Sequence, residues 1–168
     1  EAFVEKLGKA YEEIGFVAVK NHGLSDELSD RLYQQVKAFF DLSPEIKAQY
    51  EIDGLAGQRG YTSFGKEHAK GRNTGDLKEF WHFGQYVEDD DPIREEYPAN
   101  VEVKELPQFN EVGKAAYQTL ENAGRNMLRA IALYLGLEET YFDSRIHHGN
   151  SILRPIHYPP ITDEPEGA

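Results

Sequence analysis

The chain has 168 residues, of which 39% are hydrophobic, 29% are charged and none is cysteine. This composition predicts one folded domain, or a large piece of one, and excludes a disordered tail, a disulfide scaffold and thiolate metal sites. The formal charge of −12 and the lack of a long apolar run lead us to expect no nucleic-acid partner and no membrane partner, and the absence of cysteine favours a cytoplasmic protein.

Two amphipathic helices are predicted near the start of the chain, with a strand between them. Apolar residues recur at helical spacing over residues 3–14, and Gly15 is placed to end this helix. The β-branched and aromatic run 16–20 predicts a buried strand, and residues 21–23 predict a turn. Ser25 is expected to cap the second helix, because a serine side chain accepts a hydrogen bond from the first helical turn.

A short helix and a long glycine-rich loop follow. Pro44 predicts the first turn of a helix that extends to about Tyr50, since proline is favoured at that position. Residues 53–75 are rich in glycine and predict a loop without regular structure. Arg59 and Tyr61 lie on this loop, where a guanidinium and a phenol either clamp a carboxylate or simply anchor the loop.

The second half of the chain alternates between strands and helices. A strand is predicted over 78–87, and the acidic residues 88–96 predict a solvated connector. A long amphipathic helix is expected after Pro107. A last strand is predicted over 151–158, where Pro155 indicates an edge position because proline lacks a backbone N–H.

The common motifs for phosphate binding and serine catalysis, GxxxxGK[ST], GxGxxG and GxSxG, do not occur. Glu79 and His82 would point to opposite faces of a strand, and the adjacent His147 and His148 are not expected to converge on one ion. We therefore expect no metal site built from this chain alone. A small site that combines His147, His148 and His157 stays open as an alternative.

The last predicted strand is unusual because polar and apolar residues share one face. Arg154, Ile156 and Tyr158 are spaced by two and therefore lie on the same side of a strand. A buried arginine and a phenol on one face favour either an acidic ligand or a structural partner.

Several short segments occur in a recognisable order along the chain: Gly15–Leu24, Phe39–Pro44 with Lys47, Arg59–Tyr61 with Gly65 and Glu67, Asp76–Phe80, Ser151–Arg154 and His157–Pro160. Together these segments resemble the N-terminal region of the isopenicillin N synthase-like non-haem iron oxygenases, a group that includes many 2-oxoglutarate-dependent dioxygenases.

The resemblance implies an α+β fold. Residues 1–145 would form an N-terminal helical subdomain, and residues 146–168 would supply the first strand and loop of a double-stranded β-helix (jelly roll) that is incomplete in this chain. It also implies an Fe(II)-dependent oxygenase that uses 2-oxoglutarate and hydroxylates, desaturates or ring-closes a small-molecule substrate.

The resemblance also implies roles for three residues. Tyr158 matches a tyrosine that contacts the co-substrate or substrate carboxylate in many relatives, so it is the expected cofactor-binding residue. Ile156 stands where plant relatives commonly have asparagine, which is a departure from the family pattern. Arg59 and Tyr61 lie where relatives place residues of the substrate pocket.

The largest departure concerns the metal ligands, because none of the six histidines is followed two positions later by aspartate. The family's His-x-Asp pair and second histidine come after the Tyr-Pro-Pro segment. We therefore expect no catalytic or metal residue within this chain, and we expect the ligands of Fe(II) and 2-oxoglutarate beyond Ala168, in the remainder of the catalytic barrel. The chain alone would be inactive. The alternative is a non-catalytic helical binding or interaction module of the same fold.

Overall fold

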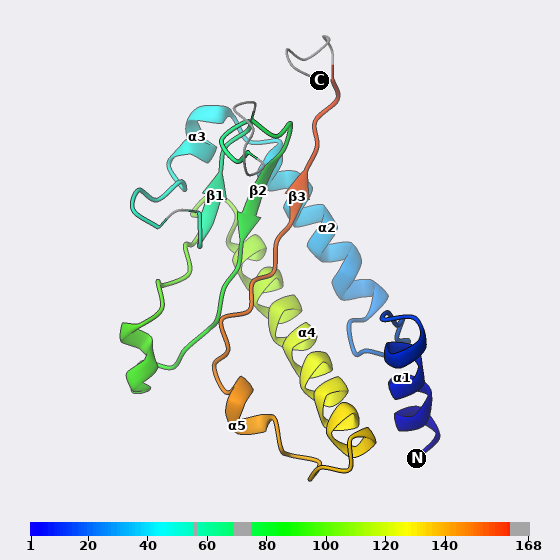
Figure 1. Cartoon of the computed structure of the whole chain (residues 1–168). Coiled ribbons are helices and arrows are strands. Elements are labelled where there is room, and N and C mark those ends of the chain that lie inside the picture. Colours follow the sequence, from blue (N-terminus) through cyan, green and yellow to red (C-terminus); the bar gives the residue numbers. More distant parts are fainter. Residues whose placement is uncertain (56, 69–74, 162–168) are drawn as a thin grey trace.

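The computed structural model describes residues 1–55, 57–68 and 75–161, which form an α+β fold as predicted (Figure 1). Helices pack against one face of a three-stranded antiparallel sheet. The elements in chain order are α1 (Ala2–Glu13), α2 (Asp26–Phe40), α3 (Pro44–Ala48), β1 (Gly60–Thr62), β2 (Glu79–His82), the 3-10 helix η1 (Pro92–Glu95), α4 (Pro107–Tyr134), α5 (Asp143–Ile146) and β3 (Ile156–His157).

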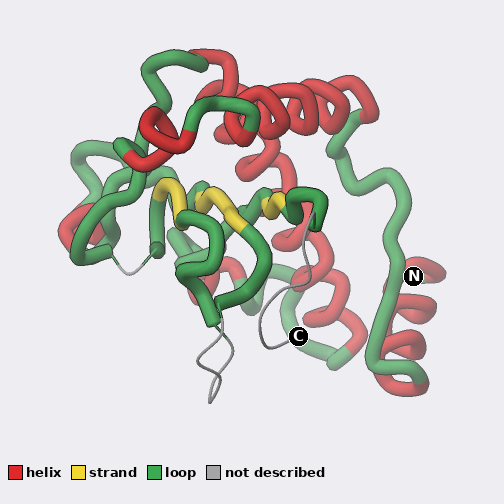
Figure 2. Tube along the Cα trace, turned by 90° about the horizontal axis from the view of Figure 1, so that it is seen from above, coloured by secondary structure: helices red, strands yellow, loops and turns green. Residues whose placement is uncertain are grey.

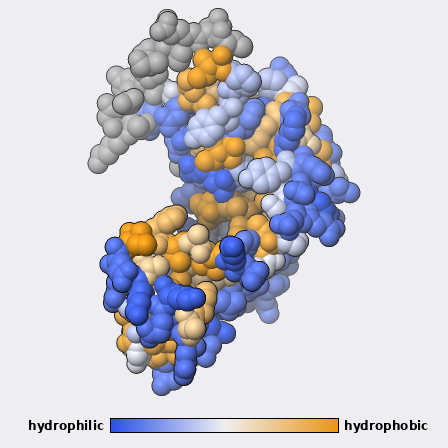
Figure 3. All heavy atoms as spheres, turned by 90° about the vertical axis from the view of Figure 1, so that its right-hand side faces the viewer, coloured by the Kyte–Doolittle hydropathy of each residue, from blue (hydrophilic) through white to orange (hydrophobic). Residues whose placement is uncertain are grey.

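The first helix ends as predicted, but the strand expected after it is wrong. Gly15 adopts a φ of +75°, a left-handed conformation that stops α1. Residues 16–20 have no regular structure and pair with no described strand, and the Phe16 side chain is 72% exposed. A strand needs a neighbour for its backbone N–H and C=O groups, so the local pattern alone does not make one. Figure 3 shows this side of the molecule, where apolar side chains gather in a hollow.

The cap predicted for α2 is confirmed. The Ser25 hydroxyl accepts a hydrogen bond of 3.1 Å from the backbone N–H of Leu28, which satisfies one of the free amides of the first turn. The helix then brings Phe39 to its last turn, where the ring is fully buried. This residue begins the core.

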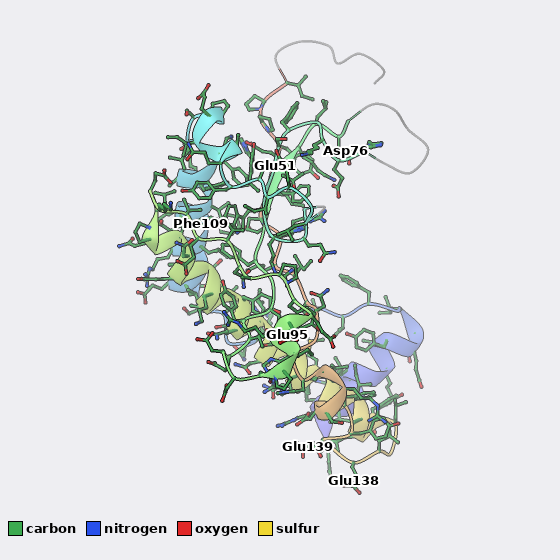
Figure 4. The ribbon with its side chains drawn as sticks, turned by 90° about the vertical axis from the view of Figure 1, so that its left-hand side faces the viewer. Glu51, Asp76, Glu95, Phe109, Glu138 and Glu139 are labelled. Atoms are coloured by element: carbon green, nitrogen blue, oxygen red, sulfur yellow. The ribbon has the colours of Figure 1, made fainter. Side chains whose placement is uncertain are left out.

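The core lies where α2 and α4 meet the sheet. The rings of Phe39 and Phe109 stack with centroids 5.1 Å apart, and Trp81 of β2 meets both rings edge-on. Figure 4 labels Phe109 within this layer. Gly113 lets α4 approach the sheet, because a β-carbon there would lie 2.2 Å from the ring of Phe83. The N-terminal half of α4 is therefore fixed against the sheet by close packing.

The sheet has the order β1-β2-β3, and its three strands lie side by side (Figure 2). Tyr61 pairs with Trp81, and Phe80 pairs with Ile156. Strand β1 lies inside the stretch predicted to lack regular structure, so that prediction is wrong at residues 60–62. Strands β2 and β3 are shorter than predicted, and β3 is at the edge of the described sheet, as Pro155 indicated.

Side chains alternate between two faces of this sheet. We call the face that packs on α2 and α4 the inner face and the opposite one the outer face. The inner face carries Tyr61, Glu79, Trp81, Phe83 and His157; the outer face carries Thr62, Phe80, His82 and Ile156.

The long helix α4 is confirmed, but its apolar stripe is buried unevenly. Phe109, Val112 and Ala116 are buried, whereas Leu120 is 38% exposed and Leu135 is 59% exposed. The difference arises because the sheet covers only the first part of the helix.

None of the described helices is long and apolar enough to cross a membrane.

Candidate functional site

A buried carboxylate ties four elements together beneath the sheet. Glu79 of β2 accepts hydrogen bonds from Lys47 of α3 at 2.7 Å, from the hydroxyl of Tyr61 in β1, and from His157 of β3 at 2.8 Å. The Lys47 ammonium also donates to the carbonyl oxygen of Phe40, the last residue of α2. We call Lys47, Tyr61, Glu79 and His157 the Glu79 cluster. It fixes β3 relative to the preceding elements.

The Glu79 cluster keeps its carboxylate ionised. Burial alone would raise the pKa of Glu79, but the hydrogen bonds from Lys47, Tyr61 and His157 together lower it below its ordinary value. Burial and the bond to this carboxylate raise the pKa of Tyr61, so its phenol stays protonated and donates. An ionised acceptor surrounded by three donors is a well-satisfied buried group.

On the outer face, Arg154 lies against an imidazole and an aromatic ring. Its Nε is 2.5 Å from Nε2 of His82, and its guanidinium carbon lies 4.3 Å from the centroid of the Phe80 ring. Burial lowers the pKa of His82 to about 4, and the charge of Arg154 adds to this effect. The ring is therefore neutral at pH 7: its Nδ1 donates to the carbonyl oxygen of Gly57, and its Nε2 accepts from Arg154.

A cavity of about 310 Å³ adjoins the outer face, beside Thr62 and Phe80. Its rim carries Glu51, Lys66 and Glu67, and the Lys66 ammonium is 2.8 Å from the Glu51 carboxylate. Figure 4 labels Glu51 at this end of the sheet. The volume falls at the lower end of small-ligand pockets, and the polar rim suits a polar molecule.

The three predicted site residues lie in different places. Tyr158 directly follows β3; it is 66% exposed, and the alternation along the strand places it with Ile156 on the outer face. Tyr61 is buried on the inner face within the Glu79 cluster. Arg59 is 1% exposed and donates to the carbonyl oxygen of Gln58. The structure therefore does not bring Arg59 and Tyr61 to the exposed surface that carries Tyr158.

The Arg59 guanidinium lies directly against Gly84, in the space that a side chain at this position would need. A β-carbon on Gly84 would lie 1.8 Å from the guanidinium carbon. Its Nε and Nη2 have no hydrogen-bond partner among the described residues. Burial lowers the pKa of Arg59, while the nearby phenols of Tyr117, Tyr97 and Tyr86 partly oppose this. The position is that of an interior anchor between β1 and the segment after β2.

The prediction that adjacent histidines cannot converge is wrong. Among the described residues, Asp91, His147 and His148 bring one ligand atom each within 4.8 Å of one another. His157, the third histidine of the alternative site, is instead bound to Glu79.

Sequence reasoning missed the Glu79 cluster, although a signal was present. Glu79, Trp81 and Phe83 alternate along one strand, so the carboxylate shares a face with two large aromatic rings. A carboxylate on a core face needs buried donors. The partners could not be identified, because Lys47 and His157 lie 32 and 78 positions away.

Residues 1–105 match the sequence profile of a family described as "non-haem dioxygenase in morphine synthesis N-terminal". Among curated proteins, the chain is 29% identical to 2-oxoglutarate-dependent dioxygenase htyE of Aspergillus rugulosus over 96% of this chain and 51% of that protein. It is 31% identical to proline hydroxylase buaE of Petromyces alliaceus, again over 96% of this chain and 51% of the relative. The chain thus spans about half the length of these relatives.

A solved structure agrees with this match. A 2OG-Fe(II) oxygenase family protein from Caulobacter crescentus superimposes with a TM-score of 0.87 at 39% identity, over 97% of this chain and 53% of the other. JOX2 in complex with 2OG, Fe and JA superimposes with a TM-score of 0.71 at 22% identity, over 96% of this chain and 46% of the other, which shows a shared fold.

Proposed function

The chain belongs to the 2-oxoglutarate- and Fe(II)-dependent dioxygenase family, and we propose that it is the N-terminal part of a non-haem oxygenase that oxidises a small molecule. The reaction class is hydroxylation, desaturation or ring closure. Two of the relatives that it matches are named as a 2-oxoglutarate-dependent dioxygenase and a 2-oxoglutarate-Fe(II) type oxidoreductase, which supports the same co-substrate here.

The organisation that we propose divides the chain near residue 146. Residues 1–145 would form the helix-rich N-terminal region, and residues 146–168 would supply the first strand and loop of a jelly-roll barrel; residues 162–168 lie outside the described part of the chain. Two observations support this division. β3 is the edge of the described sheet, so a further strand has backbone groups to pair with. The chain also covers 53% of the superimposed oxygenase from Caulobacter crescentus.

The observation that carries the proposal is the exposed phenol at the end of β3. Tyr158 is 66% exposed and has no hydrogen-bond partner among the described residues, so its hydroxyl is free to donate to a carboxylate. Arg154 lies four residues earlier on the same face, and the neutral His82 accepts from its Nε and so fixes the guanidinium. A phenol donor and a fixed positive charge on the same face suit an anion such as 2-oxoglutarate.

The same face does not fit iron. His82 is the imidazole on the outer face among the described residues, and both of its ring nitrogens are already engaged, with Gly57 and with Arg154. A neutral histidine needs a free nitrogen lone pair to bind a metal. The iron ligands that we propose therefore belong to the remainder of the barrel.

The decisive experiment measures 2-oxoglutarate binding to the whole protein, including the residues encoded after Ala168. Tyr158→Phe removes one hydroxyl and keeps the ring, so we expect the affinity to fall by about 10-fold or more, as for loss of a hydrogen bond to a charged group. Tyr33→Phe is the matched control, because Tyr33 is 75% exposed on α2 and should leave the affinity unchanged.

Two binding results would contradict the proposal, and so would one sequence result. One is a whole protein that neither binds nor consumes 2-oxoglutarate in the presence of Fe(II), which would favour a binding module instead of an enzyme. The other is an unchanged affinity in Tyr158→Phe, which would remove this residue from the co-substrate site. A reading frame that lacks a His-x-Asp pair after Ala168 would contradict the oxygenase assignment at the sequence level.

A further inference from the structure

Two histidines and an aspartate meet at the junction of η1 and α5. Asp91 is the N-cap of η1, and His147 and His148 follow the last residue of α5. Nε2 of His148 is 3.0 Å and Nε2 of His147 is 3.6 Å from the same carboxylate oxygen, Oδ2 of Asp91. Figure 4 shows η1, marked by Glu95, beside α5. None of these residues belongs to the surface proposed for the co-substrate.

The separations of these atoms suit coordination of one cation. Zinc binds imidazole nitrogen and carboxylate oxygen at about 2.0–2.2 Å, so tetrahedral geometry places neighbouring ligand atoms about 3.3 Å apart. The two nitrogen–oxygen distances, 3.0 and 3.6 Å, lie on either side of that value. All three ligand atoms lie within 4.8 Å of one another, so a small inward shift of the histidine rings would complete the set.

The backbone holds the three side chains in this arrangement. His148 has a φ of +49°, the left-handed region that non-glycine residues seldom adopt, and this turn directs both adjacent rings toward Asp91. The hydroxyl of Tyr97 donates to the His148 carbonyl oxygen at 2.8 Å. The other carboxylate oxygen of Asp91 accepts from the backbone N–H of Ile93 at 3.0 Å, which leaves Oδ2 for the histidines. Outer contacts of this kind orient metal ligands.

We propose that Asp91, His147 and His148 bind one first-row divalent cation of the zinc type. Two imidazoles and one carboxylate suit zinc, nickel or copper better than magnesium or calcium, which prefer oxygen ligands. The His147 side chain is 67% exposed, whereas those of His148 and Asp91 are 19% and 24% exposed. The site thus opens to solvent on one side, and water completes the coordination. Its role is to clamp the loop that follows α5 onto η1.

The test is calorimetric titration of the 168-residue chain with ZnCl₂, in a buffer that does not chelate metal. We expect saturable binding of one equivalent. His148→Asn is the main variant, because asparagine tolerates the left-handed conformation better than alanine does. His147→Gln and Asp91→Asn remove the other two ligands. Each substitution should weaken binding at least about 10-fold, because loss of a direct ligand costs no less than loss of an outer contact.

His68→Ala is the matched control, since His68 is exposed and belongs to no described group of potential ligands. It should bind zinc like the unaltered chain. Bound Co²⁺ gives a second readout: its visible spectrum should indicate nitrogen and oxygen ligands and should disappear in His148→Asn. Circular dichroism establishes that each variant is folded. The proposal is overturned if the chain shows no saturable zinc binding, if the folded ligand variants bind as tightly as the unaltered chain, or if His68→Ala weakens binding equally.

Discussion

Replacing Lys47 by methionine removes the cation of the Glu79 cluster while keeping the length of the side chain. The side chains of Lys47 and Glu79 are 9% and 6% exposed, so the carboxylate loses its compensating charge inside the protein. The ammonium also donates to the Phe40 carbonyl oxygen, and that bond is lost as well. Glu79 keeps its contacts with Tyr61 and His157.

The expected cost follows from these contacts. Breaking a buried ion pair by removing one partner lowers the free energy of unfolding by about 3–5 kcal/mol. The two remaining donors on Glu79 place the cost of losing the ion pair near 3 kcal/mol, and the lost carbonyl bond adds about 1 kcal/mol. In the double variant Lys47→Met/Glu79→Gln no charge is left unpaired. We therefore expect a coupling energy of about 2 kcal/mol, so that the double variant is less destabilised than the sum of the single changes.

The measurement is urea unfolding followed by fluorescence of Trp81, the single tryptophan, which is fully buried in the strand that carries Glu79. Lys37→Met is the control, because Lys37 forms an exposed pair with Asp41 and its loss should change stability little. Strictly additive changes, or a cost below about 1 kcal/mol for Lys47→Met, would refute the conclusion that this ion pair holds the sheet to α3.

Three further predictions concern stability. Gly60→Ala should lower the free energy of unfolding by about 2–5 kcal/mol, because the residue has a φ of +77° and its β-carbon would lie 2.5 Å from the Tyr50 carbonyl oxygen. The control Gly124→Ala has open space around it in α4 and should raise the free energy of unfolding by about 0.5–1 kcal/mol. Equal effects of the two substitutions in urea unfolding would contradict this prediction. Burial lowers the pKa of His82 from 6.5 to about 4. The neutral ring therefore makes its full contribution to the free energy of unfolding above pH 6.5, and this contribution is lost as the pH falls toward 4. The unaltered chain should lose about 3 kcal/mol of stability over this pH range, and His82→Asn should not. The same pH dependence of unfolding in both proteins would contradict this role of His82. Ser25→Ala should cost about 1 kcal/mol through the lost cap of α2, and an unchanged thermal melt would disprove that role.

The helices were predictable because their signals are local. The caps and the periodic apolar residues of α1, α2 and α4 lie within a few turns of one another, and Ser25 and Gly15 act as predicted. The strands were less predictable because pairing decides them. Residues 16–20 have strand-forming side chains but no described partner, whereas the three residues of β1 form a strand because β2 lies beside them.

The candidate site shows the same limit. Alternation over residues 154–158 correctly predicted that Arg154 and Ile156 share a face, since that rule concerns neighbouring residues. Nothing local indicates that Arg154 contacts His82, which lies 72 positions earlier. The convergence of His147 and His148 depends on a left-handed residue that the side-chain pattern does not specify. Distant pairs and single backbone angles are therefore the features that needed the structure.

The Glu79 cluster also implies an order of folding. Tyr61 and Lys47 lie 18 and 32 positions from Glu79, whereas His157 lies 78 positions away. Closing a longer loop costs more entropy, so we expect the contacts among α3, β1 and β2 to form before β3 docks. During synthesis the carboxylate meets its lysine well before its histidine leaves the ribosome. The ionised Glu79 carboxylate would therefore already be in place when His157 of β3 docks against it.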